Sequence, residues 1–167
     1  MEVTLATVMG QVIQDLSLPK GLGILHHPEG VDLLPANIEL SGMEVTLVNT
    51  MSRETVLREC LSGIQEQYDI ILLDCCPSLG MLTINALAAA GQVLIPAQAN
   101  YLSLKGLEQL MRTISKVRRQ INPRLTVAGI VVTMADMRTV YTRDVVDLLH
   151  SAYDGKLKVF ESIIPAS

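Results

Sequence analysis

The residue whose type and position point most directly to chemistry is Asp74. It follows an unbroken apolar run, Ile70 to Leu73, and it is followed at once by Cys-Cys-Pro-Ser and then by Gly80. Such a run, left through Pro and Gly, predicts a parallel strand over residues 69–74 that is buried on both faces. The carboxylate would lie at the carboxyl end of that strand, where open α/β sheets bind ligands. The spacing is equally compatible with a capping role for Asp74 in the turn or the next helix.

Two other groups of residues have side chains of the types that bind metals in other proteins. His26 and His27 fall in a predicted turn, but neighbouring side chains on an extended chain point apart and no third ligand is close in the sequence. The three cysteines, Cys60, Cys75 and Cys76, lack the spacing of a zinc site. Their number and spacing favour reduced thiols in the core of a cytosolic protein.

Strands and helices alternate along the chain. Hydrophobic spacing predicts helices over 4–16, 83–90, 103–120 and 142–152, a helix capped by Ser52 whose apolar stripe ends at Ile64, and strands over 31–34, 69–74, 92–96, 125–133 and 158–164. No assignment can be made for 43–51. The alternation indicates an α/β fold with a mostly parallel, doubly wound sheet. Right-handed crossovers would then bring Asp74, residues 96–100 and residues 133–136 to one edge of the sheet.

Composition limits the class of protein. The 167 residues, of which 49% are hydrophobic and 18% charged, predict one globular domain over 1–167. A net charge of −4 argues against a basic nucleic-acid-binding protein as a whole, and 3% aromatic residues argue against a base-stacking module. Neither a signal peptide nor a membrane span is recognisable, so we expect a soluble cytoplasmic protein that does not bind membranes.

A basic stripe lies on the predicted helix over 103–120. Its basic residues are Lys105, Arg112, Lys116 and Arg119, which together with Glu108 recur at three- and four-residue steps opposite the apolar face. Such a stripe could contact phosphate backbones non-specifically. Glu108 within it favours the alternative, an ordinary solvated helix face.

Four segments resemble the ParA/Soj/MinD family of ATPases. DIILLDCCPSLGMLTINAL, at 69–87, is similar to the switch II region of that family. Further matches follow in the family's order: VDLLPANIELSGME at 31–44, VLIPAQANYLSLKGLEQL at 93–110 and VVTMADMRT at 131–139. Together the resemblance spans about Thr4 to Ile164. It implies a P-loop NTPase-like fold of the SIMIBI type.

The resemblance also implies roles for individual residues. Asp74 matches the Walker B-type acid, which is expected to hold Mg²⁺ through water beside the γ-phosphate of ATP. Pro77, Ser78 and Gly80 match the switch loop that responds to the phosphate state. The loop near the adenine pocket is matched by Thr133, Met134, Asp136 and Arg138, and the proline loop on the other side of that pocket by Pro165. In this family ATP drives a dimer that binds DNA non-specifically, sometimes on the nucleoid, and a ParB-type partner stimulates hydrolysis.

Departures from the family pattern change the expected activity. The sequence contains no G-x-x-x-x-G-K-[ST] loop, which cradles the phosphates of ATP. Cys76 replaces a usual Pro, and Asn100 replaces a frequent acid. The chain thus resembles the middle of a ParA-type protein, without its first strands and its C-terminal part.

We therefore expect that this chain alone neither binds nor hydrolyses ATP, which leaves open whether it acts as an enzyme. The strand that ends at Asp74 would lack its neighbour, because in this family the strand before the phosphate-binding loop lies beside it. Exposed strand edges promote self-association. The alternative function is a non-catalytic, ParA-like module that docks on a partner protein or on DNA.

Overall fold

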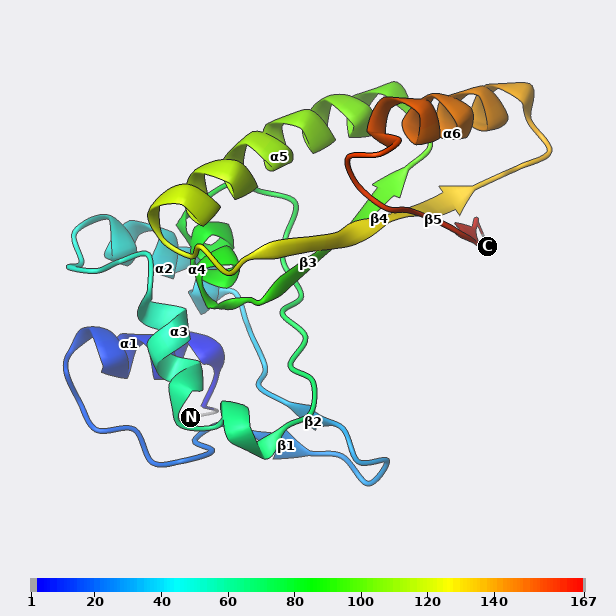
Figure 1. Cartoon of the computed structure of the whole chain (residues 1–167). Helices are drawn as coiled ribbons and strands as arrows, with labels where there is room; N and C mark the ends of the chain where they lie inside the picture. The colour runs from blue at the N-terminus through cyan, green and yellow to red at the C-terminus, as the bar shows by residue number, and fades with distance from the viewer. Residues whose placement is uncertain (1–2, 167) are drawn as a thin grey trace. The chain divides into compact units, whose positions relative to one another are not determined.

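The computed structural model describes residues 3–166, and the chain divides into two compact units, 1–90 and 91–167 (Figure 1). A single domain over 1–167 stays a prediction. The first unit is mostly helical. Its elements are α1 (Leu5–Ile13), β1 (Leu25–His26), β2 (Asp32–Leu33), α2 (Glu39–Val48), α3 (Val56–Ser62), the 3₁₀ turn η1 (Gln65–Gln67) and α4 (Met81–Ala89).

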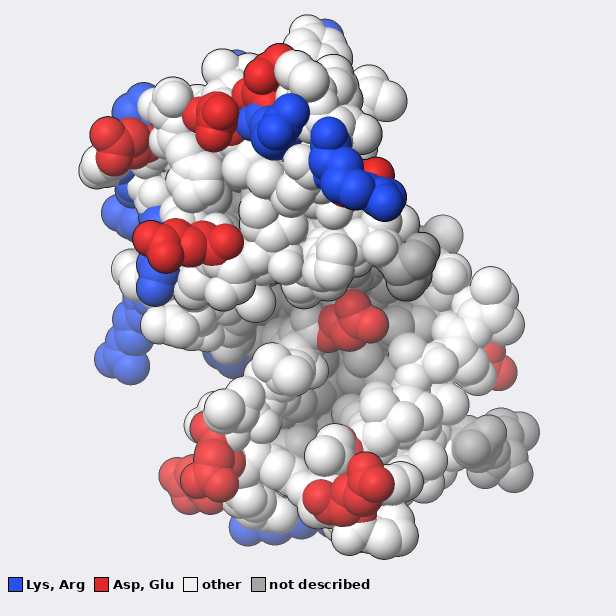
Figure 2. Space-filling model, turned by 90° about the vertical axis from the view of Figure 1, so that its right-hand side faces the viewer, with Lys and Arg blue, Asp and Glu red and all other residues white. Residues whose placement is uncertain are grey.

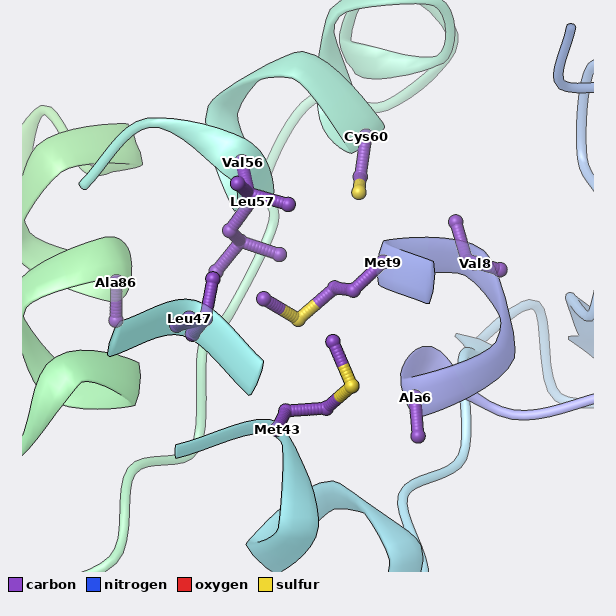
Figure 3. Packing of buried hydrophobic residues seen from close by; sticks show 9 residues of the cluster. All are labelled: Ala6, Val8, Met9, Met43, Leu47, Val56, Leu57, Cys60 and Ala86. Atoms are coloured by element: carbon purple, nitrogen blue, oxygen red, sulfur yellow. The ribbon is translucent and has the colours of Figure 1, made fainter. Parts of the chain in front are cut away.

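The core of the first unit is formed by buried apolar side chains from each of its four α-helices. Met9 of α1 and Met43 of α2 point toward one another, and Leu47 is fully buried beside them (Figure 3). The buried members are Ala6, Val8, Met9, Met43, Leu47, Val56, Leu57, Cys60 and Ala86. Flexible methionine side chains fill the irregular space between helices that cross at different angles. The core thereby holds α2, α3 and α4 together, and the segment before α4 is attached to this group of helices.

The predicted strand over 69–74 is wrong. Residues 70–76 have no regular secondary structure, and Ile70 and Leu72 are 76% and 88% exposed. A strand needs neighbours that pair its backbone N–H and C=O groups. Among the described residues, none of the strands pairs with this segment. An apolar run is therefore insufficient to form a strand here.

The chain around the two histidines forms an exposed hairpin. The predicted turn at 26–30 is confirmed and joins β1 to β2, which pair antiparallel, with Gly30 at φ 80°. The predicted strand at 31–34 shrinks to two residues, and Leu33 is 58% exposed, so its predicted burial is wrong. Polar contacts take the place of a core: Asp32 accepts a hydrogen bond from the Tyr68 hydroxyl at 2.7 Å, and its other oxygen lies 2.7 Å from His26 Nδ1.

Ser52 does not cap a helix. It adopts a left-handed conformation with φ 51°, and its carbonyl accepts hydrogen bonds from Thr55 N–H at 2.9 Å and Thr55 Oγ1 at 3.0 Å. This turn delays the helix until Val56. The predicted stripe is confirmed where Val56, Leu57 and Cys60 are buried.

The second unit is a parallel sheet with two helices. It runs β3 (Gln92–Gln98), α5 (Tyr101–Gln120), β4 (Thr126–Ala135), α6 (Val140–Tyr153) and β5 (Val159–Pro165), with strand order β3-β4-β5. Both helices lie on one face of the sheet, as right-handed crossovers that advance in one direction require (Figure 1). Ile95, Ala97, Ile130 and Val132 are buried. The predicted α/β class with a parallel sheet is confirmed.

Candidate functional site

The switch segment, which we define as residues 74–80, leads directly into α4. Asp74, Pro77 and Ser78 are exposed, and Gly80 immediately precedes the first residue of the helix. A tight turn forms where Ser78 N–H donates to the Cys76 carbonyl at 2.7 Å. Thr83, in the first turn of α4, donates its hydroxyl to the Ser78 carbonyl at 2.8 Å. The end of the segment is thus attached to the helix, while Asp74 is left in solvent.

Glu44 of α2 caps α4. Its Oε2 accepts the Met81 N–H at 2.7 Å and its Oε1 accepts the Leu82 N–H at 3.2 Å. A carboxylate at this position satisfies two of the four unpaired donors of the first turn and complements the helix dipole. The close approach requires a glycine before the helix, because a Cβ on Gly80 would lie 2.8 Å from Glu44 Oε2 and closer still to Oε1.

Asn85 ties α4 to the start of α3. The residue is fully buried. Its Oδ1 accepts the Leu57 N–H at 3.1 Å, and its Nδ2 donates to the carbonyls of Arg53 at 2.7 Å and Met81 at 2.9 Å. Glu44 and Asn85 belong to the segments that resemble the family, but sequence reasoning assigned neither of them a role. The signal available was an amide within the mostly apolar helix MLTINALAA, whereas Glu44 lies in a helix of mixed polarity.

The thiols differ in exposure. Cys60 is buried, which raises its pKa to about 12, whereas Cys75 and Cys76 are exposed residues of the switch segment. The expectation of core thiols is therefore right for Cys60 and wrong for the other two. Partial desolvation of the sulfur, and then the neighbouring Cys76 and Asp74, raise the pKa of the Cys75 thiol.

In the second unit, the residues predicted for the adenine side gather at the carboxyl edge of the sheet. Gln98 and Thr133 are register partners, as are Ala135 and Pro165. The Gln98 amide lies 3.2 Å from Met134 Sδ. Residues 96–100 and 133–136 therefore share one edge, as expected. Asp74 belongs to the first unit, and its position at that edge stays a prediction.

The loop after β4 is held by an internal ion pair. Arg138 donates from Nε to Asp136 Oδ1 at 2.8 Å and from an Nη to Oδ2 at 3.0 Å. These bonds hold the pKa of Asp136 below its ordinary value and raise that of Arg138. Thr139 then caps α6 by accepting the Thr142 N–H at 3.2 Å. Asp136 and Arg138 thus shape the loop, and a nucleotide-binding role for them stays a prediction.

The basic stripe on α5 is exposed but partly neutralised. Arg112 donates to Glu108 at 2.6 Å, and the Lys105 ammonium lies 5.0 Å from the centre of the Tyr101 ring. Lys116 and Arg119 are exposed on the same helix. In the upper part of the face drawn in Figure 2, basic and acidic side chains of the described residues lie close together. Contact of this stripe with nucleic-acid phosphates therefore stays a prediction, beside the alternative of an ordinary solvated helix face.

Residues 3–166 contain no cluster of three or more His, Cys, Asp or Glu side chains that could enclose a metal ion. The histidine pair agrees with this, since His26 faces Asp32 and His27 Nδ1 accepts the Glu29 N–H at 3.3 Å. Asp74 is a single exposed carboxylate, and a role for it in holding a metal ion stays a prediction. None of the described helices is long and apolar enough to cross a bilayer.

Comparison with known proteins places these features in a family context. A family model described as an AAA domain matches residues 2–127. The chain is 42% identical over 137 residues to the sporulation initiation inhibitor protein Soj of Bacillus subtilis, which covers 82% of this chain and 53% of Soj. It is 42% identical over 161 residues to the chromosome partitioning protein ParA of Myxococcus xanthus, or 95% of this chain and 56% of that protein. The chain therefore spans about half the length of these curated relatives.

Solved structures agree with the fold. A cobyrinic acid a,c-diamide synthase from Mycobacterium smegmatis, with a bound ATP analogue and magnesium, is 37% identical and superposes with a TM-score of 0.83 over 99% of this chain and 65% of that one. The apo form of McdA from Cyanothece superposes equally well, with a TM-score of 0.83 over 99% of this chain and 65% of that one, at 19% identity. The second similarity supports the fold alone.

Proposed function

The chain belongs to the ParA/Soj family, and on this premise we propose that it supplies the switch segment and the adenine-side loops of a ParA-type partitioning ATPase. The observation that carries the proposal is the preserved order of four family segments along the chain. The relatives' names, chromosome partitioning and sporulation control, support a role in the segregation of a chromosome, plasmid or mobile element.

Asp74 would face the metal and the phosphates in that role. A bound Mg²⁺ would supply positive charge to neutralise the phosphates of ATP. An exposed carboxylate can hold a water of such an ion. The sequence has no phosphate-binding Lys loop. Asp74 and the adenine-side loops would therefore contact only part of an ATP–Mg²⁺ complex. The 167-residue chain by itself should be inactive toward ATP.

The first unit would transmit a change in the switch segment to its helices. Pro77, Ser78 and Gly80 connect Asp74 to α4, and Thr83 anchors Ser78. Glu44 then links α4 to α2, and Asn85 links it to α3. A movement of the switch segment would therefore move α4. The contacts of α4 with Glu44 and through Asn85 would pass this movement to α2 and α3.

In the second unit, Thr133, Met134, Asp136, Arg138 and Pro165 would line the adenine side. ATP-dependent dimerisation, non-specific DNA binding and stimulation by a ParB-type partner complete the proposal. The candidate DNA contacts are Lys105, Arg112, Lys116 and Arg119. Since Arg112 is engaged with Glu108, we expect Lys116 and Arg119 to contribute most.

A chimera tests the function. The part of this chain that matches Bacillus subtilis Soj, 137 residues long, would replace its counterpart in Soj, which supplies the remaining half of the length. Mg²⁺-dependent ATP hydrolysis would then be measured. We expect the chimera to hydrolyse ATP and the Asp74→Asn variant to lose this activity. Asp69→Asn, at an exposed position five residues before Asp74, is the matched control and should keep it. A folded chimera without activity would contradict the ATPase proposal.

A second measurement concerns the alternative, a non-catalytic module that docks on a relative or on DNA. The 167-residue chain would be titrated with a fluorescent ATP analogue, with and without Mg²⁺. We expect no saturable binding. Magnesium-dependent binding in the range of about 1 μM to 1 mM, typical of enzymes for their substrates, would show that the chain alone is a nucleotide-binding protein. Binding to intact Soj without nucleotide would favour the docking module.

A further inference from the structure

Two exposed thiols are adjacent in the switch segment. Cys75 and Cys76 lie between Asp74 and Pro77, and both side chains belong to exposed residues. The third cysteine, Cys60, is buried in the core of the first unit. A reagent that needs two accessible sulfurs on one chain therefore has a single pair to bind.

Only weak contacts hold the two sulfurs. Cys75 Sγ lies 3.5 Å from the Leu73 carbonyl, and Cys76 Sγ lies 3.5 Å from the Ser78 hydroxyl. A thiol is a weak donor and a weak acceptor, so these contacts cost little to break. The backbone around the pair is also outside any strand or helix. Rotation about ψ of Cys75 and φ of Cys76 can thus bring the sulfurs to one side while the peptide bond stays trans.

A direct disulfide fits this pair poorly. Adjacent Cα atoms are about 3.8 Å apart, below the roughly 4.4–6.8 Å that disulfides span, so the closed ring would be strained. An atom inserted between the sulfurs enlarges the ring and removes that constraint. The geometry therefore favours a bridging acceptor over oxidation.

We propose that Cys75 and Cys76 form a vicinal-dithiol site for a soft, thiophilic acceptor with two exchangeable positions, of which a trivalent arsenical is the simplest example. With a mono-substituted arsenical, two S–H bonds and the As=O bond break, two S–As bonds form, and one water leaves. The oxidation state of arsenic and sulfur does not change, so no oxidant is required. The bridged pair would restrain the segment between Asp74 and Pro77.

Phenylarsine oxide is the probe that tests this site. The folded chain would be incubated with the reagent, and intact mass would count the phenylarsenic groups bound. We expect one group per chain, displaced by 2,3-dimercaptopropanol but not by an equal concentration of a monothiol. Hydrogen exchange should slow at residues 75–80 in the adduct.

Serine variants provide the matched controls. Cys75→Ser and Cys76→Ser each remove one sulfur from an exposed position, so circular dichroism should show an unchanged fold. Each should weaken binding by about 100-fold or more, because the second bond forms intramolecularly in the intact pair. Cys60→Ala should bind like the unmodified chain. Undiminished binding in either serine variant, or no adduct in the unmodified chain, would overturn the proposal.

Discussion

The Glu44 carboxylate of α2 caps α4 by accepting the Met81 N–H at 2.7 Å. Local capping uses a residue next to the helix, whereas this cap comes from 37 residues earlier in the chain. The first turn of the helix that follows the switch segment is therefore stabilised by α2.

Glu44→Ala tests this cap. Because the Met81 and Leu82 N–H groups lose their acceptor, we expect the free energy of unfolding in urea to fall by about 1–2 kcal/mol. Glu44→Gln should cost less than Glu44→Ala, since its one remaining oxygen still accepts one of the two N–H groups, while the second acceptor and the negative charge are lost. Glu66→Ala, at an exposed position, should stay within about 0.5 kcal/mol of the unmodified chain. Equal effects of Glu44→Ala and Glu66→Ala would contradict the capping role.

Gly80→Ala should disrupt the same contact from the other side. Gly80 has an ordinary φ of −77°, so the backbone accepts alanine, and only space opposes it. The new Cβ would displace the Glu44 carboxylate. We expect the double variant Glu44→Ala/Gly80→Ala to be more stable than the sum of the single effects by about 1 kcal/mol. Strict additivity in urea unfolding would show that the two residues act independently.

Asn85→Leu should be among the most destabilising single changes in the first unit. It leaves the Leu57 N–H and the Arg53 carbonyl without their buried partner, at a cost of about 2–4 kcal/mol. Asn85→Asp keeps an acceptor for Leu57 but loses the donor, and it buries a charge. Thermal and urea unfolding would measure both, with the exposed Asn49→Ala as a control. A change below about 0.5 kcal/mol for Asn85→Leu would contradict the bridging role of the amide.

The contact between Asp32 and Tyr68 predicts a dependence of stability on pH. The Tyr68 hydroxyl lowers the pKa of Asp32 below its ordinary 3.8, so the stabilisation is present above that value and is lost as the pH falls through the folded-state pKa. The same bond raises the pKa of Tyr68 above 10.0, so its contribution is present below 10.0 and is lost as the pH rises through the folded-state pKa. Unfolding in urea across the pH range would record both losses.

Tyr68→Phe should abolish the loss of stability at high pH, because the titrating hydroxyl is gone. It should only reduce the loss of stability at low pH, because His26 still faces Asp32. Tyr141→Phe, on an exposed tyrosine of α6, provides the matched control and should keep both. Identical pH profiles for Tyr68→Phe and Tyr141→Phe would show that the contact between Asp32 and Tyr68 does not cause the two losses of stability.

The exposed apolar run before Asp74 predicts self-association. Leu72 is 88% exposed and lies in a segment whose backbone is unpaired by any described strand. Leu72→Lys should therefore reduce the oligomer fraction in light scattering, while Leu148→Lys, on an exposed leucine of α6, should change it less. A monodisperse monomer before substitution would contradict the expectation.

Sequence reasoning succeeded where the signal is local. The apolar stripe of α5, the turn at Gly30 and the alternation of β3, α5, β4, α6 and β5 all follow from short-range periodicity, and the structure confirms them. It failed at residues 69–74 and at β2, because strand formation depends on a neighbour that periodicity does not reveal. It also missed Glu44 and Asn85, since their partners lie 28 to 38 residues away.

The sequence by itself determined the family and the parallel α/β class, because these depend on residue types in a fixed order. Only the tertiary structure decided how the switch segment is held. Glu44, Gly80 and Asn85 meet at α4 because the methionine-rich core packs α1, α2, α3 and α4 together, and no local pattern encodes that meeting. The exposure of Cys75, Cys76 and Leu72 was also decided there, because burial is a property of the packed neighbours and not of the residue.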